Sequence, residues 1–223
     1  MALLSRAALV DTERPDVISL SANFLAPGKP GPVEVTSHEV KTGRRFATRR
    51  CELRSGEKLL VTATVITGNL DDGESPRLVD APMPDMPPPG ELPRVEPAEL
   101  FPPPFMAQVE LRLHPDDLIG SGNGPRVRGW FRLPDGEAMD TSTLILAADA
   151  LPPTVFNADL KVGWSPTIQM TTHIRARPTT EWILVHTHST VIKDGMFEAD
   201  AVLFDQTGEV IAQGRQLQLL AQA

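Results

Sequence analysis

A single carboxylate stands in the middle of the most apolar stretch of this sequence. The stretch 140–153, DTSTLILAADALPP, begins with an Asp-Thr pair that can cap a helix and ends with two prolines that prevent the helix from continuing. The residues between them predict about three turns that are apolar on nearly every side, which is typical of a buried helix. Asp149 lies within these turns. Because an unpaired buried charge is costly, we expect a hydrogen-bond partner for Asp149 and a raised pKa that suits a general base.

A second candidate lies on the last predicted strand, residues 210–220. Gln216 shares one face of this strand with Val210, Ala212 and Gly214. An amide among small residues on a packed face indicates a side chain that lines a pocket.

The elements that must position these residues fall into two halves. Helical spacing and strand alternation predict helices over residues 1–13 and 140–153, and strands over residues 16–24, 33–40, 46–53, 58–67, 107–113, 126–133, 167–177, 182–192, 196–204 and 210–220. Residues 71–104 are rich in proline and show no periodicity, so they predict a linker that is extended and ordered against the surface.

The two halves repeat one plan, with corresponding features about 150 residues apart. The turn at Ser55-Gly56-Glu57 corresponds to Thr207-Gly208-Glu209, and Phe24-Leu25-Ala26-Pro27 corresponds to the segment 174–178. An antiparallel meander around one buried helix is a hotdog. We therefore expect an α+β double hotdog, with a first hotdog over residues 1–70, a linker over 71–104 and a second hotdog over 105–223.

The repeat also predicts a difference between the halves. Two strands precede the helix of the second half, whereas Met1 lies directly on the helix of the first. We expect the first hotdog to lack this N-terminal hairpin, either because the true start lies upstream or because the hairpin has been lost.

Composition narrows the possible partners and location. The 223 residues are 41% hydrophobic, enough for a real core, and the net charge of −8 argues against nucleic-acid or anionic-membrane partners. Cys51 is the only cysteine, which excludes a disulfide framework and a thiolate metal site and fits a reducing compartment. No apolar run approaches the roughly 18 residues of a membrane span. We expect a cytoplasmic protein that self-associates as a homo-oligomer, most simply a dimer, through its exposed sheet faces.

With these residues in place, the chain resembles the TesB-like acyl-CoA thioesterases (acyl-CoA thioesterase II) nearly from end to end. The resemblance rests on DVISLSANFLAPG at 16–28, TGRRFATR at 42–49, LAADAL at 146–151, TIQMTTH at 167–173, Glu181-Trp182, and GEVIAQGRQ at 208–216. It implies a hydrolase that cleaves acyl-CoA into free fatty acid and CoA by direct attack of water, with no metal or redox cofactor and no covalent intermediate.

The resemblance also implies the site residues. Family members hold the water with an Asp, a Thr or Ser, and a Gln, which match Asp149, Thr167 and Gln216 here. Asp149 would be the base, and the other two would orient the water. Thr167 alternates with Ile168, Met170 and Ile174, so a β-bulge is needed to bring it to the helix side if those residues face the helix.

Two departures from the family pattern keep alternatives open. The Gly-Gly pair that precedes the first helix in the family would lie upstream of Met1, and Ser21 stands where many members have a His. A non-catalytic hotdog that binds acyl thioesters or lipids is therefore the first alternative. A dehydratase acting on enoyl-CoA is weaker, because that chemistry needs an Asp and a His near one helix start and no such pair is found.

Three further groups have both a functional and a structural interpretation. The basic group Arg44, Arg45, Arg49, Arg50 and Arg54 could contact CoA phosphates, but a solvated edge is favoured. His173, His186 and His188 could bind zinc, but a polar sheet face or a subunit contact is favoured. The glycine-rich stretch 120–124 lacks the lysine of a phosphate-binding loop and predicts a flexible hairpin loop.

Overall fold

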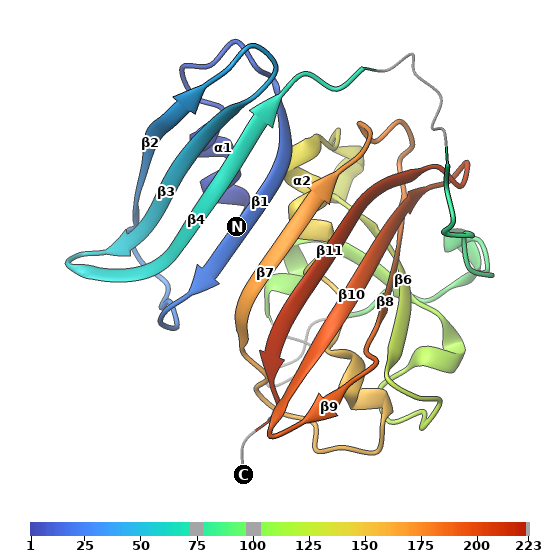
Figure 1. Ribbon diagram of the computed structural model, residues 1–223. Coiled ribbons are helices and arrows are strands. Elements are labelled where there is room, and N and C mark those ends of the chain that lie inside the picture. Colours follow the sequence, from blue (N-terminus) through green and yellow to red (C-terminus); the bar gives the residue numbers. More distant parts are fainter. Residues whose placement is uncertain (72–77, 97–103, 222–223) are drawn as a thin grey trace.

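One large antiparallel sheet dominates the computed structural model, which describes residues 1–71, 78–96 and 104–221. Its strands follow the order β2-β3-β4-β1-β7-β11-β10-β8-β6-β5, and the short β9 pairs with β10. The two helices lie together on one face of the sheet (Figure 1). The elements are α1 (Ala2–Ala8), β1 (Asp16–Phe24), β2 (Glu34–Thr42), β3 (Ala47–Ser55), β4 (Lys58–Gly68), β5 (Glu110–Leu113), β6 (Arg126–Arg132), α2 (Thr141–Ala147), β7 (Thr167–Ile174), β8 (Ile183–His188), β9 (Ile192–Lys193), β10 (Met196–Asp205) and β11 (Val210–Leu219).

The strands of the two halves occupy matching places on either side of the β1–β7 pair. From this pair outward, the order is β1-β4-β3-β2 in one half and β7-β11-β10-β8 in the other. The turns that follow β1 and β7 also match, because the amides of Leu25 and Ala26 donate to the Leu60 carbonyl at 2.8 and 3.3 Å, as those of Arg175 and Ala176 do to the Ile211 carbonyl. The predicted extra hairpin of the second half is present as β5 and β6, at the far end of the sheet.

Several predicted boundaries are wrong. The first helix ends at Ala8 instead of reaching residue 13, and Asp11 just beyond it has a φ of 55°, which a helix cannot contain. The segment predicted as the strand 107–113 begins inside the 3-10 helix Pro104–Gln108, and its strand starts only at Glu110. The second helix also ends early, at Ala147.

The core lies between the sheet and the two helices. Leu144 and Ile145 of α2 are fully buried there, against residues such as Leu20 of β1 and Met170 of β7. Asp140 caps α2 as predicted, since its carboxylate accepts the Thr143 amide at 2.8 Å. The Thr141 hydroxyl accepts the Val17 amide at 3.0 Å and so joins the start of α2 to β1.

The described part of the proline-rich segment, residues 78–96, contains no strand and packs on β5 and β6. The Pro87 carbonyl accepts the Trp130 indole N–H at 2.8 Å, and the Val95 amide donates to the Leu111 carbonyl at 2.8 Å. This agrees with an extended segment ordered against the surface.

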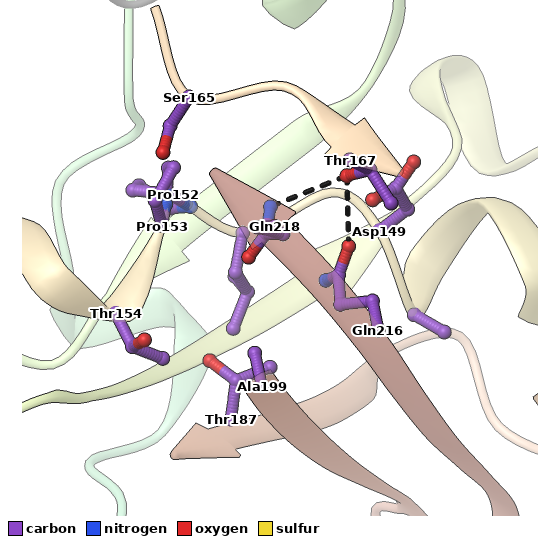
Figure 2. A pocket seen from close by; sticks show the side chains of 12 residues that line it. Asp149, Pro152, Pro153, Thr154, Ser165, Thr167, Thr187, Ala199, Gln216 and Gln218 are labelled. Atoms are coloured by element: carbon purple, nitrogen blue, oxygen red, sulfur yellow. Dashed lines mark hydrogen bonds between the residues drawn. The ribbon is translucent and has the colours of Figure 1, made fainter. Parts of the chain in front are cut away.

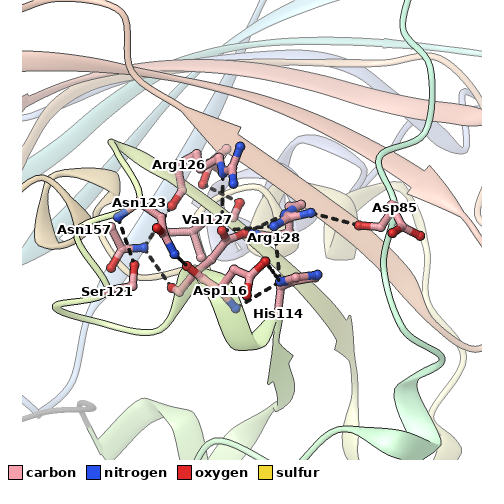
Figure 3. A network of polar contacts seen from close by, with 11 residues as sticks. Asp85, His114, Asp116, Ser121, Asn123, Arg126, Val127, Arg128 and Asn157 are labelled. Carbon is pink, nitrogen blue, oxygen red and sulfur yellow. Dashed lines mark hydrogen bonds and ion pairs between the residues drawn. The ribbon is translucent and has the colours of Figure 1, made fainter.

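A buried ionic network fixes the chain between β5 and β6. The Asp117 carboxylate accepts hydrogen bonds from the Arg128 amide and guanidinium at 3.0 and 2.7 Å, and Arg126 pairs with it at 3.3 Å. Figure 3 shows this network around the labelled Arg126 and Arg128. The Asn157 amide donates to the backbone carbonyls of Asp117 and Arg126. The glycine-rich stretch 120–124 therefore connects two ends that are firmly held.

No helix among the described residues is long and apolar enough to cross a membrane.

Candidate active site

A cavity of about 150 Å³ lies where the chain leaves α2 and where β7 and β11 meet (Figure 2). It is large enough for ordered water and a small reacting group. Its lining residues are Ala148, Asp149, Leu151, Pro152, Pro153, Thr154, Ser165, Thr167, Thr187, Ala199, Gln216 and Gln218. All three residues predicted for the site are among them.

The environment of the Asp149 side chain differs from the one that the sequence predicts. We expected a carboxylate buried within a helix, but α2 ends at Ala147 and the Asp149 side chain is exposed, facing the cavity. The helix ends because its hydrogen bonds tighten to a three-residue span, from Asp149 N to Leu146 O at 3.1 Å and from Ala150 N to Ala147 O at 3.2 Å. The prediction of a hydrogen-bond partner is also wrong: within the described ranges, the carboxylate has none.

The pKa of Asp149 is nevertheless raised, to about 6. Desolvation by the surrounding protein is the main cause, and the positive Met1 amino group acts in the opposite direction. Exposure and desolvation are compatible here, because the side chain lines a cavity where solvent can touch it, while the surrounding protein atoms desolvate the carboxylate. A carboxylate with this pKa is largely ionised at neutral pH and can accept a proton.

Thr167 and Gln216 are joined by a hydrogen bond from the Thr167 hydroxyl to the Gln216 side-chain oxygen at 3.1 Å. Thr167 reaches this position through the predicted bulge: Leu217 pairs with Gln169 and Gln218 pairs with Thr167, so Ile168 is skipped in the register. Asp149 lines the same cavity as this pair, and all three side chains are labelled in Figure 2.

Gln218 is a site residue that the sequence interpretation missed. Its Nε2 donates to the Thr167 Oγ1 at 3.3 Å, and its side chain is buried. Residues two apart on a strand share a face, so the alternation that placed Gln216 also places Gln218 beside it. That signal was available in the sequence.

The other hydroxyls of the cavity wall already have protein partners. Ser165 donates to the Leu219 carbonyl, Thr187 donates to the Val127 carbonyl at 3.2 Å, and Thr154 shares a hydrogen bond with Ser189 at 2.5 Å. The polar side-chain atoms left for a ligand or water are therefore the Asp149 carboxylate and the Gln216 Nε2, whereas the Gln218 Oε1 is buried and has no partner among the described residues.

The other predicted groups lie away from this cavity. His186 and His188 are adjacent, with ring centroids 5.7 Å apart, and His173 and His188 line a hollow of about 360 Å³ on the opposite face of the sheet. In the portion of the chain that is described, no three potential ligands are close enough to hold a metal ion. Arg44 and Arg45 border a third hollow together with Arg14.

Comparisons with known proteins agree on a family. The model of the acyl-CoA thioesterase N-terminal domain matches residues 1–68, and that of the C-terminal domain matches residues 80–220. The structure of a putative thioesterase II from Thermobifida fusca is 30% identical, with a TM-score of 0.88 over 100% of this chain and 85% of that one. A hotdog-fold protein of unknown function from Alicyclobacillus acidocaldarius is 26% identical, with a TM-score of 0.86 over 100% of this chain and 85% of that one.

An uncharacterised protein of Mycobacterium tuberculosis is also similar. The two sequences are 28% identical over an alignment 222 residues long that covers 91% of this chain and 76% of that protein. The two family models together account for most of the sequence, and the structural similarity extends over its whole length. The chain has the hotdog fold and belongs to the acyl-CoA thioesterase family.

Proposed function

We propose that this protein hydrolyses acyl-CoA thioesters by direct attack of a water molecule held by Asp149, Thr167 and Gln216. The observation that carries the proposal is their meeting in one cavity. A carboxylate whose pKa is raised to about 6 lies there beside a hydrogen-bonded Thr–Gln pair. A base that acts at neutral pH needs a pKa near this range.

In the proposed reaction, the water donates a hydrogen bond to the Asp149 carboxylate and accepts one from the Gln216 amide. Its oxygen attacks the thioester carbonyl carbon while Asp149 takes the proton. The tetrahedral intermediate then collapses, breaks the carbon–sulfur bond and releases CoA as a thiolate, which Asp149 can protonate. The products are a free fatty acid and CoA, and Asp149 returns to its ionised state.

The test is a thiol-release assay on acyl-CoA substrates from short to long chains, comparing the wild-type protein with Asp149→Asn. We expect turnover in the wild type and a loss of about 10²-fold or more in the variant, the usual contribution of a general base. Cys51 adds little background, because it is buried and its thiol pKa is raised by burial. Full activity in Asp149→Asn, with unchanged melting temperature, would refute the role of this carboxylate.

The alternative of a non-catalytic acyl-thioester-binding protein is favoured by one observation. Ser21, at the position of the family's histidine, shares a hydrogen bond with Thr171 at 2.9 Å and accepts one from Gln169 at 3.3 Å. These residues are not among those that line the cavity. Acyl-CoA binding without turnover, equal in the wild type and Asp149→Asn, would support this alternative.

We also propose that the chain consists of two hotdogs, over residues 1–70 and 105–223, joined by the segment 71–104. The matching strand orders and the matching turn hydrogen bonds support this division.

The exposed face of the sheet is the surface through which we propose that the protein forms a dimer. It carries the polar hollow lined by His173, His188, Asp200 and Arg215. Light scattering coupled to gel filtration would test the dimer, and a monomeric mass would refute it.

The single cysteine supports a cytoplasmic location.

A further inference from the structure

Among the described residues, the Gln218 side chain makes one hydrogen bond, and that bond has a direction. Its Nε2 donates to the Thr167 Oγ1 at 3.3 Å, while the Thr167 hydroxyl donates to the Gln216 Oε1 at 3.1 Å. A threonine hydroxyl has one proton to give. Because Gln218 supplies a donor to this hydroxyl, its proton is directed to Gln216.

The direction of this chain determines what Gln216 offers to the cavity. With its Oε1 engaged by Thr167, the Gln216 amide presents Nε2–H groups, which are donors only. A water that accepts from Nε2 keeps both of its protons to donate, and Asp149 is an acceptor beside it. The reversed chain would turn the Gln216 oxygen toward the water and compete with Asp149 for its protons.

The orientation of Gln218 itself has a physical basis. The side-chain oxygen is buried without a partner among the described residues and points away from Thr167 in Figure 2. If the amide were flipped, two N–H groups would lie in that partnerless position instead of one oxygen. The observed orientation leaves fewer hydrogen-bonding groups unsatisfied.

We propose that Gln218 is a positioning residue, which sets the direction of the hydrogen-bond chain from Gln218 through Thr167 to Gln216 and so aims the water's protons at Asp149. This inference rests on the proposed thioester hydrolysis. A buried amide with an unsatisfied oxygen is a poor choice for packing alone, since an apolar side chain of the same length would fill the space without that penalty.

Two substitutions separate this role from packing. Gln218→Met keeps the length of the side chain but removes the donor. Gln218→Glu introduces a carboxylate that can only accept, which reverses the chain at neutral pH and restores a donor when it becomes protonated. Gln213→Met is the matched control: it changes another glutamine of β11, which faces the opposite side of the sheet and bonds Arg175.

The measurements are kcat and KM on the best acyl-CoA substrate from pH 5 to 9, with the melting temperature of each variant. For Gln218→Met we expect kcat to fall about tenfold, as for one lost hydrogen bond, with KM changed less than about threefold. Gln218→Glu should lose more at pH 8, and its activity relative to the wild type should rise as the pH falls. Among the residues that the structure describes, Asp149 is the only titratable side chain that lines the cavity, and dividing by the wild-type activity removes its own titration, so this recovery would report the introduced carboxyl.

The result separates the inference from the proposed function. If the wild type turns over and Asp149→Asn does not, a kcat for Gln218→Met within twofold of wild type, or a Gln218→Glu deficit independent of pH, would overturn the inference and leave the function standing. If the wild type shows no turnover, crystal structures decide. A Thr167 side chain or Gln216 amide that reorients in Gln218→Met supports the inference, and an unchanged site overturns it.

Discussion

Asp149 owes its proposed chemistry to a position that is reachable by solvent but poorly hydrated. A carboxylate on an open surface would have its ordinary pKa and would be a weak base, whereas one sealed in the core could not meet a substrate. In this protein Asp149 lies between these two extremes. The helix α2 ends two residues before it, so the side chain lines a cavity instead of being buried in the core. The cost is a carboxylate that the folded protein solvates less well than water does.

The first prediction concerns pH and belongs to this residue. Because Asp149 must be ionised to accept a proton and its pKa is about 6, kcat/KM should rise with pH up to about 6 and level off above pH 7. A pH–rate profile with a short-chain acyl-CoA would measure it, after checking by circular dichroism that the protein stays folded down to pH 5. A profile that is flat from pH 5 to 8 would contradict a base at this position.

The sequence identified these residues better than their surroundings. The apolar stretch singled out Asp149, and the alternation of the last strand singled out Gln216, so two residues that line one cavity could be located from local pattern. The burial of Asp149 was predicted wrongly, because the prolines at 152 and 153 limit where a helix must end but not where it does end. The bond from Gln218 to Thr167 joins residues 51 positions apart and depends on strand pairing that alternation alone does not give.

At the scale of elements, the start of α2 is defined by a cap and its end by tightened hydrogen bonds. The Asp140 carboxylate accepts the Thr143 amide, and the Thr143 hydroxyl accepts the Asp140 amide at 3.3 Å, which together form a capping box. Since α2 packs directly on β1 and β7, its cap helps to hold the element that carries Asp149.

Removing the cap should therefore destabilise the protein without touching the cavity. We expect Asp140→Ala to lower the free energy of unfolding by about 1 kcal/mol, measured by urea denaturation. Asp140→Asn, which keeps the capping acceptor, should stay close to wild type. Glu137→Ala removes an exposed carboxylate nearby and should also change little. Equal losses in Asp140→Ala and Glu137→Ala would point to charge rather than capping as the cause.

The strands were predicted well where one of their faces packs on the helices. The β-bulge at the start of β7 was predicted as well. The alternation of Met170 and Ile174 required an irregularity to place Thr167 on the helix side, and the register shows it between Leu217 and Gln218. The early end of α1 and the 3-10 turn before β5 were missed, because backbone geometry at such ends depends on single residues such as Asp11.

At the scale of the whole molecule, the halves join through the pairing of β1 with β7, where Ser21 lies opposite Thr171. The internal repeat predicted two similar units but could not predict which strands would meet. The buried ion pairs were equally hidden: Asp16 pairs with Arg177, 161 residues away, and Asp117 with Arg128 across a loop. Such pairs leave no periodic trace in a sequence, so they become visible only when the chain is folded.

The Asp117 network gives the last prediction, on acid stability. Burial alone would raise the pKa of Asp117, but hydrogen bonds and charge from Arg128 and Arg126 outweigh it and hold the pKa below its usual value. A carboxylate whose pKa is depressed by folding contributes stability above its unfolded pKa of about 4, and this stability is lost as the pH falls through the folded value. Asp117→Asn leaves the largely buried Arg128 without its partner charge. It should therefore cost about 3–5 kcal/mol of unfolding free energy at pH 7.

The difference between wild type and Asp117→Asn should shrink as the pH is lowered below 4, because the unfolded wild-type chain then takes up a proton on Asp117 that the folded protein, with its lowered pKa, does not bind. Denaturant unfolding at a series of pH values from 7 to 3 would measure it. Asp116→Asn is the matched control, since Asp116 is the neighbouring carboxylate and its side chain is 64% exposed. A stability gap for Asp117→Asn that stays constant down to pH 3 would mean that packing of the side chain, and not its charge, holds the β5–β6 connection to the rest of the molecule.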